Sequence, residues 1–234
     1  MIHEAVILAA GSGLRLDQRL PKGLTPISGR PLLAWIAAAL AECGVTVAHA
    51  IVSDRTEFET RLADLSHDIE LRLSECPDSH LGNGRSAAYA EHLLTYDRFF
   101  LLMSDHLIGA PHLRCVAAAA ASACSLGTSA RAPWIDLDDA TKVVVDDAGF
   151  IREIGKELRT FDAIDTGVFA MTRAVFPALE EARRSAEYSL TAGNRRLCRD
   201  GLLRAAPIGD LRWYDIDTAT DLATAEAWWG QTGG

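Results

Sequence analysis

Residues 7–16 read Ile-Leu-Ala-Ala-Gly-Ser-Gly-Leu-Arg-Leu ("ILAAGSGLRL") and join an apolar run to a loop with two closely spaced glycines. The unbroken apolar run within Glu4–Ala9 predicts a strand that is buried on both faces, as strands of parallel sheets are. Gly11 and Gly13 permit a tight turn whose backbone N–H groups converge on an anion. The stretch therefore predicts a buried first strand followed by a phosphate-binding loop.

Two common phosphate-binding motifs do not fit this loop. A dinucleotide fingerprint, G-x-G-x-x-G/A, needs a small residue at the position that Leu16 occupies. A P-loop ends in G-K-[ST], and this loop has no such ending. Instead, Arg15 and Lys22 follow the glycines and add two positive charges, which favours a polyphosphate ligand over a dinucleotide.

Composition narrows the class of protein. The chain has 234 residues, 49% hydrophobic and 24% charged, which is typical of a soluble globular protein that folds without disulfides. Its formal net charge of -9 argues against nucleic acid or an anionic membrane as a partner. The five cysteines show no CxxC spacing, so neither a disulfide framework nor a zinc site is predicted. The apolar runs are too short for a signal peptide or a membrane span, so we expect a cytoplasmic protein.

The first half of the chain alternates between strand and helix patterns. The expected strands are Glu4–Ala9, Val45–Val52, Ile69–Leu73 and Phe99–Met103, and the expected helices are Pro31–Cys43, Thr56–Leu65, Arg85–Leu94 and Pro111–Cys124. Strands that alternate with helices of this length predict a parallel sheet covered on both faces. The fold class is therefore α/β, with a Rossmann-like, doubly wound and mostly parallel sheet.

The second half has a different pattern and predicts a C-terminal α+β extension. The expected elements are a hairpin of Lys142–Val145 and Phe150–Ile154, a strand at Asp165–Met171, two helices, a strand at Leu202–Ile208, and a helix at Thr218–Trp229. We expect a single domain over residues 1–234, in which 127–234 closes over the strand ends of 1–126. Ligands of such sheets bind at the carboxyl ends of the strands, where 10–30, 104–106 and 215–217 would meet.

Five segments, in order along the chain, resemble a known family. "LAAGSGLRL…PKGL" is similar to the signature of the nucleotidyltransferases, which join a nucleoside triphosphate to a phosphorylated alcohol or sugar. "HLGNGRSAAYA" (80–90) lies where cytidylyltransferases carry a base-reading loop. "LLMSDHL" (101–107), 138–169 and "WYDIDTATDLATAE" (213–226) resemble the inositol-1-phosphate cytidylyltransferases. The resemblance implies a nucleotide-diphospho-sugar transferase-like fold with a nucleotide-binding half (1–126) and an acceptor-binding half (127–234).

The resemblance implies a reaction in which the phosphate of an acceptor attacks the α-phosphorus of CTP, giving a CDP-alcohol and pyrophosphate. Inositol 1-phosphate is the acceptor that it favours. Many members of that subfamily carry a second, membrane-embedded half, and this chain of 234 residues contains none. A standalone enzyme without membrane insertion is therefore expected, and the oligomeric state stays open, with a homodimer as one option.

The resemblance also implies roles for individual residues. Asp105 and Asp217 would bind Mg²⁺ through carboxylate oxygens, with Asp215 as a helper. The residues implied to supply catalytic positive charge are Arg15, Lys22 and Lys142. The residues implied to bind the nucleotide are Leu8, Ala9, Ala10, Gly11, Ser12, Gly13, Gly82, Asn83, Gly84, Ser86 and Asp105. The residues implied to bind the acceptor are His106, Lys142, Asp165 and Thr166.

Several of these residues also have a purely structural interpretation. Lys142 would serve equally as a lysine at the edge of a hairpin, where it discourages further strand pairing. Asp217 would serve as the N-cap of the last helix, although Thr218 competes for that position. Ser86 would simply lie in the first turn of a helix, and Thr166 is a residue that favours strands.

Other functions remain open at this point. A phosphocholine or aminoalkylphosphonate cytidylyltransferase would pair Asp165 with an ammonium group and use Trp134 and Phe161 as part of an aromatic cage. A sugar-1-phosphate nucleotidyltransferase is a further option. A regulatory nucleotide-binding module without catalysis would be expected to lack the charged residues of the site, and Lys22 and Asp105 are among those present.

Overall fold

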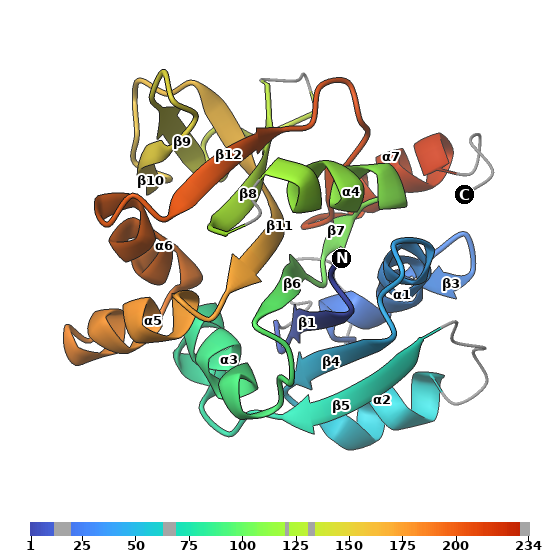
Figure 1. Ribbon diagram of the computed structural model, residues 1–234. Coiled ribbons are helices and arrows are strands. Elements are labelled where there is room, and N and C mark those ends of the chain that lie inside the picture. Colours follow the sequence, from blue (N-terminus) through green and yellow to red (C-terminus); the bar gives the residue numbers. More distant parts are fainter. Residues whose placement is uncertain (12–19, 63–68, 120–121, 131–133, 230–234) are drawn as a thin grey trace.

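The computed structural model describes residues 1–11, 20–62, 69–119, 122–130 and 134–229 (Figure 1). A single large sheet crosses this part of the chain. Its strands are β1 (Glu4–Ala9), β4 (Val47–Val52), β5 (Glu70–Glu75), β6 (Arg98–Met103), β8 (Cys124–Ser129), β9 (Lys142–Val145), β10 (Ile151–Gly155), β11 (Ala163–Thr172) and β12 (Leu203–Pro207). They are ordered β10-β9-β11-β6-β1-β4-β5, with β8 paired to β11 and β12 paired to β8.

Helices cover both faces of this sheet (Figure 1). They are α1 (Leu32–Glu42), α2 (Arg55–Leu62), α3 (Asn83–Tyr89), α4 (Ala110–Ala119), α5 (Val175–Arg184), α6 (Leu190–Arg199) and α7 (Ala219–Trp229). Side chains of β1 alternate between two hydrophobic layers, because successive residues of a strand point to opposite faces. Ile7 packs in the layer that includes α1 and α4, whereas Leu8 packs in the layer that includes α3, α5 and α6. Both faces of the first strand are therefore buried, as its apolar run predicts.

The parallel core has the predicted winding. β1 pairs in parallel with β4 and with β6, and β4 pairs in parallel with β5. The chain thus moves outward from β1 to β5 and then returns to the other side of β1 as β6. Ligands of doubly wound sheets bind outside the strand ends where the winding reverses, which here is between β1 and β6. The predicted fold class is confirmed.

The second half adds antiparallel strands to the same sheet. β11 runs antiparallel to β6, β8 and β9, and the predicted hairpin is present as β9 and β10. The expected boundary between the two halves, at 126/127, lies within β8. The division of the chain into a nucleotide-binding and an acceptor-binding half stays a prediction.

One strand of the large sheet, β8, was not predicted. The helix expected over Pro111–Cys124 ends at Ala119, and Cys124 begins β8, which is buried along its whole length. The sequence of β8, Cys-Ser-Leu-Gly-Thr-Ser, has no apolar run that would indicate a buried strand. Its polar groups are satisfied inside the protein: Ser125 Oγ donates to the carbonyl of Val116 at 2.7 Å, and the carbonyl of Gly127 accepts from Thr166 Oγ1 at 2.9 Å. Short polar side chains with internal partners therefore replace apolar ones here.

Two short ribbons complete the described structure. β7 (His106–Leu107) pairs with β13 (Tyr214–Asp215), and β2 (Pro26–Ile27) pairs with β3 (Arg30–Pro31). Within the described ranges, no helix combines the length and the apolarity needed to cross a bilayer.

Candidate active site

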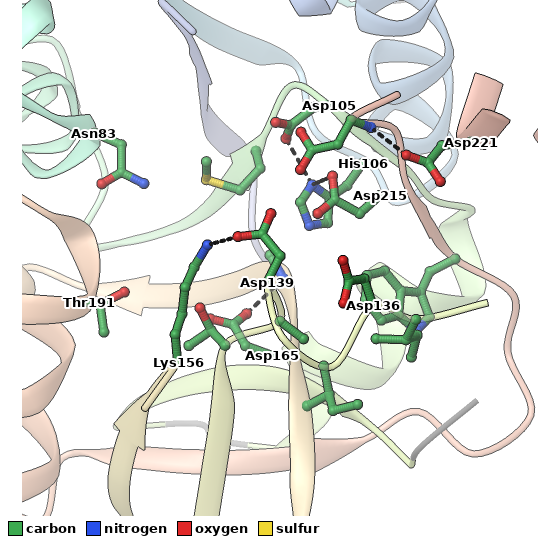
Figure 2. A pocket seen from close by; sticks show the side chains of 18 of the residues that line it. Asn83, Asp105, His106, Asp136, Asp139, Lys156, Asp165, Thr191, Asp215 and Asp221 are labelled. Carbon is green, nitrogen blue, oxygen red and sulfur yellow. Dashed lines mark hydrogen bonds and ion pairs between the residues drawn. The ribbon is translucent and has the colours of Figure 1, made fainter. Parts of the chain in front are cut away.

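An open cavity of about 680 Å³ lies beside the end of β6, the start of β11, and the N-termini of α6 and α7 (Figure 2). Acidic side chains dominate its lining. The aspartates that line it are Asp105, Asp136, Asp139, Asp165, Asp215, Asp217 and Asp221. Among the described lining residues, the lysines are Lys22 and Lys156. The cavity is thus suited to cations and to groups that donate hydrogen bonds, as well as to anions that reach its few positive charges.

The ribbon of β7 and β13 assembles one side of this cavity. Asp105 follows the end of β6, and the pairing of β7 with β13 places Asp215 opposite His106. The backbone N–H of Ile216 donates to the carbonyl of Asp105 at 3.0 Å, so Asp217 lies next to the end of β6 as well. We refer to Asp105, Asp215 and Asp217, together with Lys22 and His106, as the acidic cluster.

Lys22 lies at the centre of the acidic cluster. It begins a short 3-10 helix, Lys22–Leu24, and its Nζ donates to Asp105 Oδ2 at 2.9 Å and to Asp217 Oδ1. Burial alone would lower the pKa of Lys22, but the two carboxylates outweigh it and hold the pKa above its ordinary value. The two predicted metal ligands therefore converge on one position, and an ammonium group occupies that position.

The donor set of the acidic cluster suits a divalent cation. Asp105, His106 and Asp215 offer ligand atoms that all lie within 4.8 Å of one another, and Asp217 adds a further carboxylate at Lys22. Mg²⁺ prefers carboxylate oxygens and keeps waters and phosphate oxygens as its other ligands. The cluster can thus hold a divalent cation, and the metal-binding role of Asp105 and Asp217 stays a prediction.

The N-cap of α7 is Thr218 and not Asp217. The backbone N–H of Asp221 donates to Thr218 Oγ1 at 3.2 Å, and Asp221 Oδ2 accepts from the backbone N–H of Thr218 at 2.7 Å. This reciprocal pair is a capping box. Because Thr218 and Asp221 begin the helix, the carboxylate of Asp217 is directed to Lys22 instead of to the helix end.

His106 is held between the acidic cluster and an aromatic ring. Its Nδ1 lies 2.8 Å from Asp105 Oδ1 and 3.8 Å from Asp215 Oδ1, and its ring stacks on Trp213 with centroids 5.8 Å apart. Burial lowers the pKa of His106, but the charge of Asp215 and the hydrogen bond to Asp105 raise it to about 9. The imidazole therefore lines the cavity as a cation at neutral pH, and it would have to lose its proton to ligate a metal ion.

Asp165 reaches the cavity from a bulge in β11. The pairing of β11 with β8 shifts between Asp165 and Phe169, and Gly167 adopts a φ of +70° at the shift. A Cβ at Gly167 would lie 2.7 Å from His106 Nε2, so a larger residue would displace the histidine. Burial raises the pKa of Asp165 to about 6, although its Oδ1 accepts the backbone N–H of Gly167 at 2.7 Å. The carboxyl group therefore lies in the cavity wall with little to stabilise its charge.

Lys142 does not line the cavity. Its Nζ donates to the carbonyl of Lys156 at 2.6 Å and lies 5.9 Å from the centre of the Phe161 ring. The cation that lines this part of the cavity is Lys156, whose Nζ contacts Asp139 Oδ1 at 2.5 Å (Figure 2). The residues just before Lys142, namely Asp139, Ala140 and Thr141, line the cavity instead. The geometry therefore gives no support to the predicted catalytic and acceptor role of Lys142.

Thr166 is likewise directed away from the cavity. It is completely buried, its Oγ1 lies 3.0 Å from His112 Nε2, and its hydroxyl donates to the carbonyl of Gly127. Burial, and then the charge of His106, lower the pKa of His112 to about 3, so this histidine stays neutral. Thr166 therefore belongs to a polar network inside the core, and its predicted contact with the acceptor has no support.

The predicted base-reading loop is only partly at the cavity. Asn83 lines it, but Asn83 Oδ1 accepts the backbone N–H of Leu190 at 2.8 Å. The backbone N–H of Gly84 donates to the carbonyl of Tyr188 at 2.9 Å, and Ser86 is buried in α3. Gly82 precedes this turn and is not among the lining residues. These contacts tie the loop to the start of α6, and its role in reading a base stays a prediction.

The glycine-rich loop is described only in part. Ser12, Gly13 and Arg15 lie outside the described residues. Leu8 and Ala9 end β1, followed by Ala10 and an exposed Gly11, and the carbonyl of Leu8 accepts the backbone N–H of Ser104 at 3.2 Å. The end of β1 is therefore joined to the segment that carries Asp105, as expected for a shared nucleotide site.

Several residues of the cavity were missed by the sequence predictions, among them Lys156, Asn194 and Trp213. Lys156 lies in the segment Gly-Lys-Glu-Leu that carries the family resemblance, and this position is a signal that could have indicated it. Asn194 lies on the buried face of α6, with Leu190 and Leu197, where a lone polar residue is a detectable signal. Trp213 has no such signal, because an aromatic residue before a short strand is more often part of a core. We refer to Asp139, Lys156, Asp165 and Asn194 as the polar wall.

Residues 5–201 match the MobA-like NTP transferase domain. The chain belongs to this family. The predicted relation to nucleotidyltransferases is thereby confirmed, and the sheet with its reversal between β1 and β6 is the scaffold of a MobA-like NTP transferase.

Relatives of this MobA-like NTP transferase carry more specific names. The chain is 32% identical over 230 residues to the bifunctional IPC transferase and DIPP synthase of Thermococcus kodakarensis, covering 95% of the chain and 50% of that relative. It is 32% identical over 248 residues to the CMP-5'-(3-aminopropyl)phosphonate synthase of Streptomyces rubellomurinus, covering 95% of the chain and 38% of that relative. The chain thus spans about half the length, or less, of these curated relatives.

A solved structure is similar over nearly the whole chain. The inositol-1-phosphate CTP transferase from T. maritima superimposes with a TM-score of 0.86 at 29% identity, covering 96% of this chain and 94% of that chain. The closeness to the inositol-1-phosphate cytidylyltransferases that the sequence motifs indicate is therefore confirmed.

Proposed function

We propose that this chain is a cytidylyltransferase that joins CMP from CTP to a phosphorylated alcohol, with inositol 1-phosphate as the acceptor. The names of the relatives support this assignment, since one is a bifunctional IPC transferase and DIPP synthase and another is an inositol-1-phosphate CTP transferase. Because the chain spans about half of the first of these, the proposal concerns the transferase reaction alone.

The observation that carries the proposal is the convergence of two carboxylates from distant parts of the chain on one cation. Asp105 lies at the strand end where the winding of the sheet reverses, and Asp217 precedes α7. Both contact Lys22, which is 83 residues from Asp105 and 195 residues from Asp217. A fold that brings these three charges together beside a cavity is suited to a metal-bound triphosphate.

The reaction requires no general base. A phosphate monoester has a second pKa near ~6, so the acceptor is already largely dianionic at neutral pH. One of its oxygens forms a bond to the α-phosphorus of CTP, and the bond between that phosphorus and the β-phosphate oxygen breaks. The electron pair leaves with pyrophosphate. The task of the protein is therefore to hold two polyanions in line and to offset their charge.

Residues of the acidic cluster and of the polar wall supply this positioning. Lys22 and the charged His106 offer positive charge to the phosphates, and Arg15 is predicted to do the same from the glycine-rich loop. Mg²⁺ held by Asp105 and Asp217 would supply Lewis-acid stabilisation of the phosphate oxygens. We assign Lys156, in place of Lys142, to the phosphate of the acceptor, because Lys156 lines the cavity and Lys142 does not.

An aminoalkylphosphonate is the second candidate acceptor. The similarity to the CMP-5'-(3-aminopropyl)phosphonate synthase favours it, as does the carboxyl group of Asp165 in the cavity wall. The aromatic cage that we predicted for an ammonium group has less support. Trp134 lines the cavity, but Phe161 is not a lining residue and has Lys142 near its ring.

Pyrophosphate release tests the proposal. We expect release with CTP, Mg²⁺ and inositol 1-phosphate, and little or none when ATP, GTP or UTP replaces CTP. Release with 2-aminoethylphosphonate or phosphocholine, but not with inositol 1-phosphate, would overturn the acceptor and keep the reaction class. No release with any nucleotide and any phosphorylated alcohol would overturn the enzymatic function and favour a regulatory nucleotide-binding module.

A further inference from the structure

The side-chain amide of Asn194 is buried in the cavity wall without a partner for its oxygen. Asn194 lines the cavity and is only 1% exposed, and its Oδ1 has no hydrogen-bond partner within the described part of the chain. Nearly all buried polar groups in proteins have a partner, because a buried group without one destabilises the fold. The oxygen of a cavity-lining residue is therefore left as an acceptor that a ligand group can satisfy.

Asn83 provides a comparison within the same cavity. It is the same residue type and lines the same cavity, but its Oδ1 accepts the backbone N–H of Leu190, at the first residue of α6. Asn83 thus holds α3 and α6 together and has a structural role. Asn194 lies one helical turn after Leu190 in α6, and its oxygen accepts no hydrogen bond from the described residues.

The backbone around Asn194 is fixed on both sides. A Cβ at Gly193 would lie 2.6 Å from Leu179 Cδ2, so α6 packs closely on α5 at this point. Arg195 Nε donates to the carbonyl of Ile154 at 3.0 Å, on the strand that leads into Lys156. The amide is therefore held in place beside the polar wall before a ligand binds, and preorganised groups of this kind bind without a further ordering cost.

The chemistry of the Asn194 oxygen limits which group of an acceptor it can bind. A carboxamide offers one acceptor oxygen and one donor nitrogen, whereas a hydroxyl group both donates and accepts. The oxygen without a partner can only accept a hydrogen bond, so it needs a donor, which a hydroxyl group supplies and a phosphate oxygen does not. We propose that Asn194 Oδ1 accepts a hydrogen bond from a hydroxyl group of the acceptor. This inference rests on the proposed function.

The substitution Asn194→Leu removes both hydrogen-bonding ends and keeps a similar volume. We expect the KM for inositol 1-phosphate to rise by about tenfold or more, the size of effect that a lost, desolvated hydrogen bond produces, while the KM for CTP changes less than about twofold. The melting temperature without ligands should stay equal or rise, because an unpaired buried oxygen is removed. The matched variant Asn83→Leu should instead lower the melting temperature, because it breaks the contact with Leu190.

Deoxy analogues of inositol 1-phosphate identify the hydroxyl group. One analogue should raise the KM of the unaltered protein by as much as Asn194→Leu raises the KM for inositol 1-phosphate. With Asn194→Leu, the KM for that analogue and the KM for inositol 1-phosphate should be equal. An unchanged acceptor KM in Asn194→Leu, with turnover by the unaltered protein intact, overturns the inference alone. A rise in the KM for CTP instead would assign the amide to the nucleotide and also overturn it. Absence of turnover by the unaltered protein overturns the proposed function, and this inference with it.

Discussion

The acidic cluster and the polar wall lie in one cavity, but their charges are stabilised in different ways. In the cluster, Asp105 and Asp217 share the ammonium group of Lys22. Burial raises the pKa of Asp105, yet His106 and Lys22 outweigh it and hold the pKa well below its usual range. In the polar wall, burial raises the pKa of Asp165 to about 6, and the oxygen of Asn194 has no partner among the described residues. Asp105 and Asp217 are therefore compensated by the protein itself, whereas Asp165 and Asn194 are groups that destabilise the fold and that a ligand can satisfy.

The largest expected effect is in the acidic cluster, from removal of one carboxylate charge. Asp105→Asn and Asp217→Asn should each lower the rate of pyrophosphate release by at least ~100-fold, because metal binding and charge stabilisation are lost together. Both variants should remain folded, since the remaining carboxylate still pairs with Lys22. Circular dichroism and the release assay check this, with the exposed Asp147→Asn as control. Near-normal turnover in either variant would remove that residue from the metal site.

Removal of the Lys22 ammonium group tests whether it offsets the negative charges of Asp105 and Asp217. In Lys22→Ala, Asp105 and Asp217 would face each other without a counter-charge, and we expect the free energy of unfolding to fall by about 2–4 kcal/mol. Mg²⁺ should restore part of this loss, and EDTA should abolish the restoration. Urea denaturation measures both effects.

The pair in the polar wall provides the control for Lys22. Lys156 and Asp139 have side chains that are 57% and 40% exposed, and exposed pairs contribute less than about 1 kcal/mol. Lys156→Ala should therefore leave stability nearly unchanged. Equal destabilisation by Lys22→Ala and Lys156→Ala would contradict the contrast between the two regions.

Steady-state kinetics compare the roles of Lys156 and Lys142 in binding the acceptor. Lys156→Ala should raise the KM for the acceptor about tenfold, the effect of losing one phosphate contact, and leave the KM for CTP nearly unchanged. Lys142→Met should leave the acceptor KM within about twofold of normal, because Lys142 contacts a backbone carbonyl and Phe161 instead of the cavity. The reverse order of effects would restore the predicted role of Lys142.

The smallest expected effect is the pH dependence that Asp165 adds to stability. Its carboxyl group ionises near pH ~4 in the unfolded chain but near about 6 in the folded protein. Between these values the folded state keeps a proton that the unfolded state releases, so the free energy of unfolding falls as pH rises and is constant above pH ~6. Asp165→Asn should thus raise stability by about 1–2 kcal/mol at pH 7.5 and by less at pH 4.5. A stability gain that is equal at both pH values would show that burial does not penalise this carboxylate.

The sequence predicts the parallel core well because that core depends on apolar runs. β1 begins and ends as predicted, and the hairpin of β9 and β10 lies where the turn residues indicate it. β8 was missed because its buried side chains are small and polar, and their partners, such as Val116, come from another element. No local pattern reports a partner that is distant in the sequence.

The candidate site was predicted where its residues end strands and missed where orientation decides. Asp105 and Asp217 line the cavity where the family resemblance placed them, and their metal-binding role stays a prediction. Lys142 and Thr166 were assigned to the acceptor, but adjacent side chains of a strand point to opposite faces, and the register that decides between them comes from strand pairing. Asn194 needed the structure, because only three-dimensional contacts show that its oxygen has no partner among the described residues.

The small ribbon of β7 and β13 has a consequence for how the protein becomes active during its synthesis. The strands β1, β4, β5 and β6, the last at Arg98–Met103, are made before the ribbon's second strand, Tyr214–Asp215. The position shared by Asp105 and Lys22 gains its remaining carboxylate only when this second strand docks. A growing chain can therefore form its parallel core long before its cation position, and completion of that position reports that the chain has been made and folded through Asp217.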